Sequence, residues 1–210
     1  MPVTEFALIK LRDNYDALEF LEVLMECQEI QDNWVRQNQP WNLEPGMNLS
    51  SMYTDATDQS TLLITAPWDS PEAHGEWIQS PENSKANGSL SEFAAPGSDS
   101  VLLFHMDPAG ARPQLREAFQ HKDDNDIFDV CRLTVKDDQR EALQSEYKTL
   151  EDELRKEGLE KSIWAGWRIE KVNGEEDLVV FWTSDVPRSR LEKLASLALK
   201  KDHRRFRHVV

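Results

Sequence analysis

The feature that most constrains the fold is a repeated order of segments along the chain. Residues 62–80, LLITAPWDSPEAHGEWIQS, contain an apolar run, a Trp-x-Ser sequence, a proline and an amphipathic stretch. Residues 178–195, LVVFWTSDVPRSRLEKLA, repeat that order. Upstream of each copy, another apolar run precedes a long helical pattern. Two diverged copies of one βαββαβ unit therefore explain the chain better than a single irregular domain.

The two copies differ in the spacing between the first apolar run and the Trp. From Phe6 to Trp68 the chain advances 62 residues, whereas from Phe128 to Trp182 it advances 54. The eight additional residues match the segment 39–46, which contains two prolines and a glycine. This composition is typical of a loop inserted into the first copy.

A charged stretch that contains proline and glycine separates the copies. We predict a first unit over 1–107, a linker over 108–126 and a second unit over 127–210. Each unit is expected to be a four-stranded antiparallel sheet with helices on one face, which is a ferredoxin-like arrangement. The bare sheet faces would pack on each other and close a barrel-like core. The predicted fold class is therefore α+β, with two βαββαβ units packed as an intramolecular α/β barrel.

The spacing of apolar residues sets the expected elements. In the first copy we predict strands over 6–11, 47–54, 61–66 and 101–106, with helices over 13–38 and from Pro71. In the second copy we predict strands over 128–135, 162–171, 178–182 and 204–209, with helices over 136–157 and 188–200. The second helix of the first copy is expected to break near Ser80-Pro81. Asn173-Gly174 predicts a hairpin turn, because both residues tolerate positive φ.

Composition restricts the class of partner. The chain has 39 acidic and 24 basic residues, for a formal net charge of −15. Such a charge opposes nucleic acid or anionic membrane as the main partner. The basic segment 200–208 is the exception, and its alternation favours a last strand with one solvated face over a basic binding arm. No run approaches the roughly 18 apolar residues of a membrane span.

The N-terminus and the cysteines indicate a cytoplasmic protein. The first residues lack the positive and apolar regions of a secretion signal. Cys27 and Cys131 lie in a helical stripe and a strand run, which is typical of buried thiols in a reducing compartment. No His or Cys spacing typical of a metal site lies within an expected element, so no metal is predicted. The nucleotide motifs GxGxxG and GxxxxGK[ST] and the hydrolase motif GxSxG are also missing.

The Trp-x-Ser segments carry a resemblance to a known family. In the first copy the matching residues are the segment 68–73, Trp-Asp-Ser-Pro-Glu-Ala, followed by Ser80-Pro81. In the second copy only the segment 182–184, Trp-Thr-Ser, matches. With the order of elements, these resemble the dimeric α/β barrel superfamily. Within it, the chain is most similar to the antibiotic-biosynthesis-monooxygenase group, including its tandem members in fungi.

The resemblance implies a ligand pocket in each unit, between the sheet and the helices. Members of the superfamily include cofactor-free oxygenases of polycyclic aromatic polyketides, polyketide cyclases, haem-degrading enzymes and proteins without a known activity. The fold alone does not choose among them. In the family a His commonly stands nine residues after the motif Trp. Here Trp77 and Leu191 occupy those places, and His74 lies one helical turn earlier.

Two histidines are candidate catalytic acid–base residues, because imidazole titrates near neutral pH. His74 belongs to the predicted second helix, and the alternative is that it is an exposed helix residue. His105 belongs to the fourth strand and would act only if its strand face lines the pocket. Trp34, Tyr53 and Trp77 are candidate substrate-binding residues, since aromatic walls suit flat apolar ligands.

The distribution of these residues favours the first copy as the functional half. We expect the larger and more polar cavity there. In the second copy, leucines and a tyrosine are expected to fill the matching space as a closed core, namely Leu143, Tyr147, Leu150, Leu191 and Leu194.

Two functions remain open from the sequence. The first is a cofactor-free monooxygenase, cyclase or isomerase that acts on an aromatic or polyketide-like metabolite, such as one of secondary metabolism. The second is a non-catalytic α/β-barrel protein that binds a ligand or serves as a stress-related interaction module. The chain is expected to be a monomer or a weak homodimer, because two half-barrels in one chain would cover each other's sheets.

Overall fold

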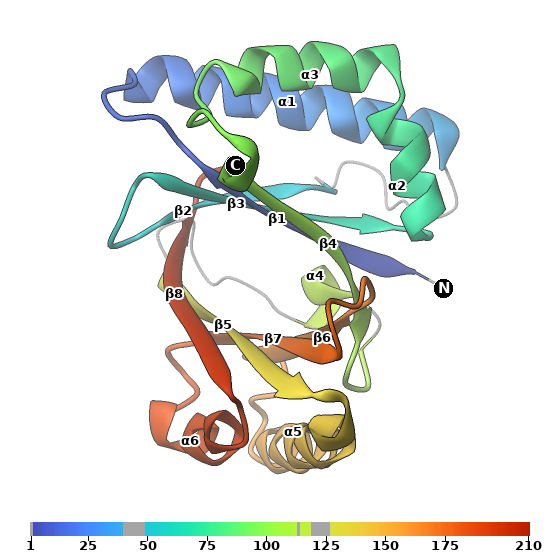
Figure 1. Ribbon diagram of the computed structural model, residues 1–210, viewed down its shortest axis with the longest axis vertical. Helices are drawn as coiled ribbons and strands as arrows, with labels where there is room; N and C mark the ends of the chain where they lie inside the picture. The colour runs from blue at the N-terminus through green and yellow to red at the C-terminus, as the bar shows by residue number, and fades with distance from the viewer. Residues whose placement is uncertain (1, 40–48, 113, 119–126) are drawn as a thin grey trace. The chain divides into compact units, whose positions relative to one another are not determined.

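The computed structural model describes residues 2–39, 49–112, 114–118 and 127–210 (Figure 1). Most of the predicted insert at 39–46 and the charged end of the predicted linker lie outside the described residues. The chain divides into two compact units. Unit 1 comprises Met1–Leu103 together with His208–Val210, and unit 2 comprises Phe104–Arg207.

Unit 1 is an antiparallel sheet with three helices on one face (Figure 1). The strands are β1 (Val3–Lys10), β2 (Ser51–Asp55), β3 (Thr61–Trp68) and the start of β4 (Val101–Pro108); the helices are α1 (Ala17–Asn38), α2 (Pro71–Ile78) and α3 (Pro81–Ser91). Strand β3 pairs with β1 on one side and with β2 on the other. Its register places Trp68 opposite Val3. The last residues of the chain hydrogen-bond to β2 through Met52.

Local sequence signals set the helix ends of unit 1. The Asp16 carboxylate accepts hydrogen bonds from the amides of Leu18 and Glu19, so α1 begins there rather than at the predicted residue 13. Ser70 caps α2 and Ser80 caps α3, each with a proline at the first helical position. The predicted break at Ser80-Pro81 is thus the junction of two separate helices.

Unit 2 is an antiparallel sheet with two helices on one face (Figure 1). Its elements are the end of β4, α4 (Leu115–Ala118), β5 (Ile127–Lys136), a 3₁₀ turn (Asp137–Gln139), α5 (Arg140–Lys156), β6 (Ile163–Arg168), β7 (Glu175–Thr183), α6 (Arg188–Ser196) and β8 (Lys200–His208). The strand order is β8-β5-β7-β6-β4, and the pairs are antiparallel. Helices α5 and α6 cover one face.

The predicted hairpin and the last strand are present in unit 2. Asn173 and Gly174 have φ values of 51° and 70°, the left-handed conformation that the hairpin requires. Strand β8 begins at Lys200, four residues before the predicted start, and α6 ends correspondingly early. Phe206 is fully buried while Arg205 and Arg207 are exposed, as a strand with one solvated face requires.

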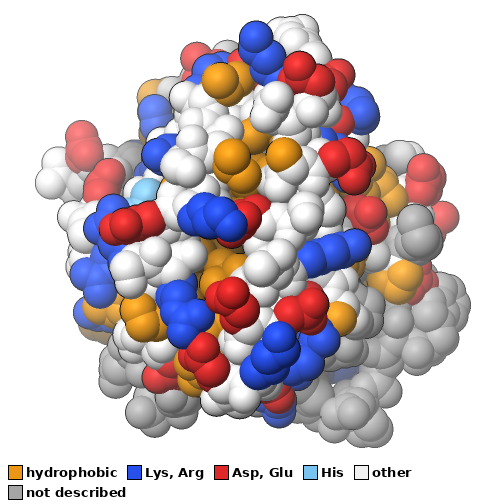
Figure 2. Space-filling model, turned by 90° about the horizontal axis from the view of Figure 1, so that it is seen from below, with side chains coloured by type: hydrophobic (Ala, Val, Ile, Leu, Met, Phe, Trp, Pro, Cys, Tyr) orange, Lys and Arg blue, Asp and Glu red, His pale blue; other side chains and the backbone are white. Residues whose placement is uncertain are grey.

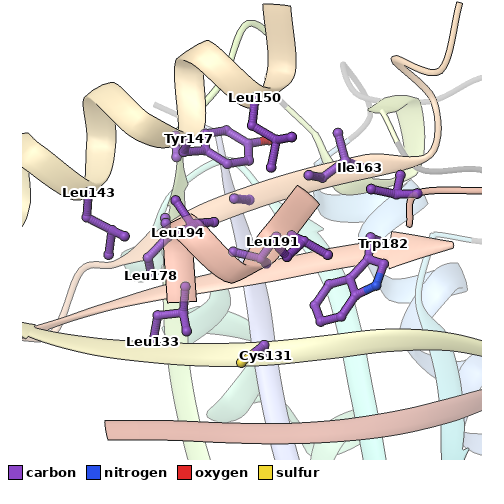
Figure 3. Packing of buried hydrophobic residues seen from close by; sticks show 14 of the residues in the cluster. Cys131, Leu133, Leu143, Tyr147, Leu150, Ile163, Leu178, Trp182, Leu191 and Leu194 are labelled. Carbon is purple, nitrogen blue, oxygen red and sulfur yellow. The ribbon is translucent and has the colours of Figure 1, made fainter. Parts of the chain in front are cut away.

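The α+β class and the order of elements in both copies are confirmed. The core of unit 2 forms between the sheet and helices α5 and α6 (Figure 3). Helix α5 contributes Leu143, Tyr147 and Leu154 to it, and all three are fully buried. Among the described residues, no helix is long and apolar enough to cross a membrane.

Candidate functional site

A buried carboxyl group on β1 lies at the centre of the candidate site in unit 1. Glu5 retains only 6% of its surface, although a glutamate rarely lies so deep without a partner. Its Oε2 atom accepts a hydrogen bond of 2.9 Å from Nε1 of Trp68. The same oxygen lies 3.5 Å from Nε2 of His74. Glu5 is therefore held between an indole and an imidazole.

The sequence around the motif Trp positions His74. Ser70 accepts a hydrogen bond from the amide of Ala73 and starts α2 directly after β3. The first turn of this helix then brings the His74 ring over Trp68, with ring centroids 4.5 Å apart and the planes 15° from parallel. His74 is 2% exposed, so the alternative that it is a solvent-exposed helix residue is wrong.

Burial changes the acidity of Glu5. Loss of hydration raises its pKa from 4.5 to about 7, and the hydrogen bond from Trp68 offsets only part of this effect. A carboxyl group with a pKa near 7 is present in both protonation states at neutral pH. It can therefore accept or donate a proton there, which an ordinary glutamate does poorly.

This carboxyl group opens onto a cavity of about 300 Å³ between the sheet and the three helices of unit 1. The volume lies at the lower end of the range for small-molecule sites. Most of the lining is apolar, from residues such as Ala7, Ile9 and Trp77. The polar lining residues are Glu5, Gln31, His74, Asn83, Asn87 and Ser91. The cavity thus combines an apolar wall with a few polar groups, as ligand sites do.

The structure brings together only part of the predicted site. His74 and Trp77 both line the cavity and both are buried. Trp34 packs behind them, with ring centroids 5.5 Å from Trp77 and 6.4 Å from Trp68, but it is not part of the lining.

Tyr53 lies away from this cavity. Met52, the residue before it on β2, lines the cavity. Because successive side chains of a strand point to opposite faces, the Tyr53 side chain points to the other face of the sheet. Its ring contacts His208 with centroids 5.4 Å apart. Burial raises the pKa of Tyr53, opposed by hydrogen bonds with Ser51 and Thr65.

His105 belongs to unit 2 and does not line the cavity of unit 1. Its Nδ1 atom lies 2.6 Å from Oε1 of Glu170, and its backbone amide donates a hydrogen bond of 2.9 Å to Oε2. Burial by itself would raise the pKa of Glu170, but these hydrogen bonds outweigh burial and lower it. The two histidines thus form separate carboxylate–imidazole pairs.

The expectation of a closed core in the second copy is wrong. Unit 2 contains a cavity of about 640 Å³, larger than that of unit 1 and lined by Leu191 and Leu194 among others. The reason is the number of helices. Two consecutive helices, α2 and α3, follow β3 in unit 1, whereas β7 is followed by the nine-residue α6 before the chain turns into β8. Part of the sheet face therefore stays uncovered.

Sequence reasoning missed Glu5. The first strand was predicted from Phe6, which left Glu5 outside it, whereas β1 starts at Val3. The signal was available in the alternation of the strand. Val3, Ala7 and Ile9 share one face with Glu5, so a single acidic residue occupies an otherwise apolar, inward face.

Comparison with known proteins shows the fold. No protein-family model matches the sequence, and comparison with curated proteins gives no match. Similar structures include a candidate monooxygenase from Fusobacterium nucleatum subsp. nucleatum ATCC 25586, with a TM-score of 0.65, 10% identity and coverage of 100% of this chain and 93% of that one. A candidate monooxygenase from Lactobacillus acidophilus NCFM has a TM-score of 0.61 and 11% identity, with coverage of 100% of this chain and 94% of that one. An anthrone oxidase-like protein has a TM-score of 0.59 and 10% identity, with coverage of 100% of this chain and 92% of that one.

At such low identity, the likeness concerns architecture only. It extends over the whole chain and agrees with the order of elements in both units. The predicted fold class, a tandem ferredoxin-like α/β barrel, is therefore confirmed. The resemblance to the antibiotic-biosynthesis-monooxygenase group stays a prediction.

Proposed function

We propose that unit 1 is a cofactor-independent enzyme of the antibiotic-biosynthesis-monooxygenase type that acts on a small aromatic or polyketide-like metabolite. The observation that carries this proposal is the Glu5 carboxyl group, buried beside His74 at the edge of an apolar cavity with its pKa raised to about 7. The fold of the candidate monooxygenases and the anthrone oxidase-like protein is consistent with it.

The proposed chemistry begins with transfer of a proton. Glu5, as the carboxylate, removes a proton from a substrate C–H group next to a carbonyl, and the electron pair delocalises as an enolate. His74, with Nε2 3.5 Å from the Glu5 oxygen, can receive that proton and return it. Trp77 provides an aromatic wall for the ring system of the substrate. Oxygenation, cyclisation and isomerisation can all begin with this step.

For oxygenation, the co-substrate is molecular oxygen. The enolate gives electrons to O₂, and a C–O bond forms to give a hydroperoxide after protonation. Loss of water from the hydroperoxide converts the original CH₂ group to a carbonyl. One oxygen atom thus enters the product and the other leaves as water, so the substrate is the only reductant needed.

A non-catalytic ligand-binding protein is the second candidate. The observation that favours it comes from the repeat. If Trp182 is matched to Trp68, then the counterpart of His74 is Arg188, and the register of β5 puts Cys131 in the place of Glu5. Unit 2 therefore keeps a cavity in which these two positions carry neither a carboxylate nor an imidazole, as a binding site would.

Oxygen consumption with anthrone as substrate would test the enzymatic proposal. We expect the wild-type kcat/KM to increase with pH with an apparent pKa near 7. The variant Glu5→Gln keeps a hydrogen-bond acceptor for Trp68, and its kcat/KM should be at least about a hundredfold lower than that of the wild type. Glu170→Gln, in the carboxylate–imidazole pair of His105, should retain activity.

Other results of the oxygen-consumption assay would point to different residues or to the second candidate function. Full activity of Glu5→Gln would remove Glu5 from the mechanism, and loss of activity in Glu170→Gln alone would favour the predicted role of His105. Binding of a panel of aromatic ketones without turnover or oxygen consumption would favour the non-catalytic candidate.

The free, buried thiols of Cys27 and Cys131 are consistent with a cytoplasmic protein, and we place the activity there.

A further inference from the structure

The cavity of unit 2 has an apolar interior. Its walls include Leu133 on β5, Val180 and Trp182 on β7, and Leu191 and Leu194 on α6, all of which are buried. Figure 3 shows Cys131, Leu133, Trp182 and the two α6 leucines on the helix-covered side of the sheet. Its volume of about 640 Å³ lies in the middle of the range for small-molecule sites.

One wall of this cavity is a flat pair of rings. The imidazole of His203 stacks on Trp182, with centroids 5.4 Å apart and planes 12° from parallel. Nε2 of His203 lies 2.6 Å from Oδ1 of Asp129, which fixes the orientation of the imidazole ring. A fixed, flat wall of this kind favours a ring system or an extended chain as the apolar part of a ligand.

The cations around the cavity differ from their neighbours. On the face of the molecule in Figure 2, Lys and Arg side chains are interspersed with Asp and Glu side chains. Other cations on α6 and β8 have such partners, namely Arg190 with Glu153 and Glu157, Lys193 with Glu146, Lys200 with Glu175, and Arg204 with Asp202. Arg188 and Lys201 line the cavity, and within the part of the chain that the structure describes neither forms an ion pair.

Both cations are close enough to the cavity interior to act on Cys131. Burial raises the pKa of this thiol to about 11, Asp202 adds to the increase, and the charges of Lys201 and Arg188 oppose it. Arg188 is also the first residue of α6, which has no side-chain cap on its amides. The positive end of the helix therefore lies on the same side as the two cations.

We propose that unit 2 binds an amphipathic carboxylate, with its apolar body in the cavity between Trp182 and the α6 leucines and its carboxylate at Arg188 and Lys201. Among the described residues that line the cavity, Glu192 is the one carboxylate, and it is exposed. The two cations outnumber it, in a chain whose net charge of −15 repels anions elsewhere. This site is separate from the proposed chemistry of unit 1 and does not depend on it.

Binding of 1-pyrenebutanoate to the full-length protein would test this site, with the neutral 1-pyrenebutanol as the matched ligand. We expect the acid to bind with micromolar affinity and the alcohol to bind at least about tenfold more weakly, because only the acid forms charge-assisted hydrogen bonds. Arg188→Gln and Lys201→Gln should each weaken binding of the acid about tenfold and leave the alcohol nearly unchanged. Arg190→Gln and Lys200→Gln, which change paired cations on the same elements, should leave both affinities unchanged.

A second measurement locates the ligand. In a Cys27→Ser variant, Cys131 is the remaining thiol, so its rate of reaction with methyl methanethiosulfonate reports on the cavity. Saturating 1-pyrenebutanoate should slow that rate at least tenfold. Thermal unfolding of each variant confirms that it is folded.

Three results would overturn the proposal. The first is an affinity for the acid that does not exceed its affinity for the alcohol. The second is a Cys131 reaction rate that the acid does not change. The third is loss of binding in Ile78→Trp, which obstructs the cavity of unit 1, together with full binding in Leu191→Trp, which obstructs that of unit 2.

Discussion

The buried carboxyl group of Glu5 should make the stability of the protein depend on pH in a defined direction. In the folded state its pKa is about 7, whereas the unfolded chain exposes it with a pKa near 4.5. Between these values the folded state binds the proton more tightly than the unfolded state. The stabilisation from this proton is complete below pH 4.5 and is lost as the pH rises through 7.

The magnitude follows from the two pKa values. Their difference, at 1.36 kcal/mol for each tenfold change in proton affinity, corresponds to about 3 kcal/mol. We therefore expect the free energy of unfolding of the wild type to fall by about 3 kcal/mol relative to Glu5→Gln between pH 4.5 and pH 8. Glutamine does not titrate, so the difference between the two proteins reports the ionisation of Glu5 together with its effect on His74 beside it.

Urea unfolding followed by tryptophan fluorescence at pH 4.5, 5.5, 6.5, 7.5 and 8 measures this difference, provided that the m-values agree. Glu170→Gln is the control, because the pKa of Glu170 is lowered in the folded state. Its contribution should be present at neutral pH and disappear only on acidification below the usual range of a glutamate. A difference between wild type and Glu5→Gln that stays constant from pH 4.5 to 8 would refute the reasoning.

Three further outcomes follow from the structure. Trp77→Ala should weaken binding of an aromatic ligand in unit 1 by a few kcal/mol in calorimetry, because it removes a large buried aromatic wall, and unchanged affinity would exclude Trp77 from the site. Leu154 is fully buried in the α5 core and does not line the cavity, so Leu154→Ala should lower the free energy of unfolding by about 3–5 kcal/mol. Leu194 lines the cavity, so Leu194→Ala should lower it by only about 2 kcal/mol in the same urea assay. Light scattering at micromolar concentration should give a mass near 24.3 kDa, and a mass of twice that value would contradict the predicted monomer.

The sequence by itself determined the features that depend on short-range interactions. The repeat predicted two βαββαβ units, and the alternation in 204–209 predicted a strand with one solvated face. The hairpin at Asn173-Gly174 and the junction at Ser80-Pro81 were predictable because their backbone preferences are set by the residues themselves. Of the predicted site, His74 and Trp77 line a cavity because they are three positions apart on one helix and so share its buried face.

Only the tertiary structure decided the partners and the spaces between elements. Glu5 meets Trp68 across 63 positions of the chain, and His105 meets Glu170 across 65. No local pattern contains such a pair, because strand register and helix placement determine which side chains meet. The cavity in unit 2 has the same origin. Its leucines are as apolar as those of a closed core. A cavity is the difference between the volume that the elements enclose and the volume that the side chains fill. The arrangement of the helices over the sheet sets the enclosed volume, and the sequence pattern does not contain it.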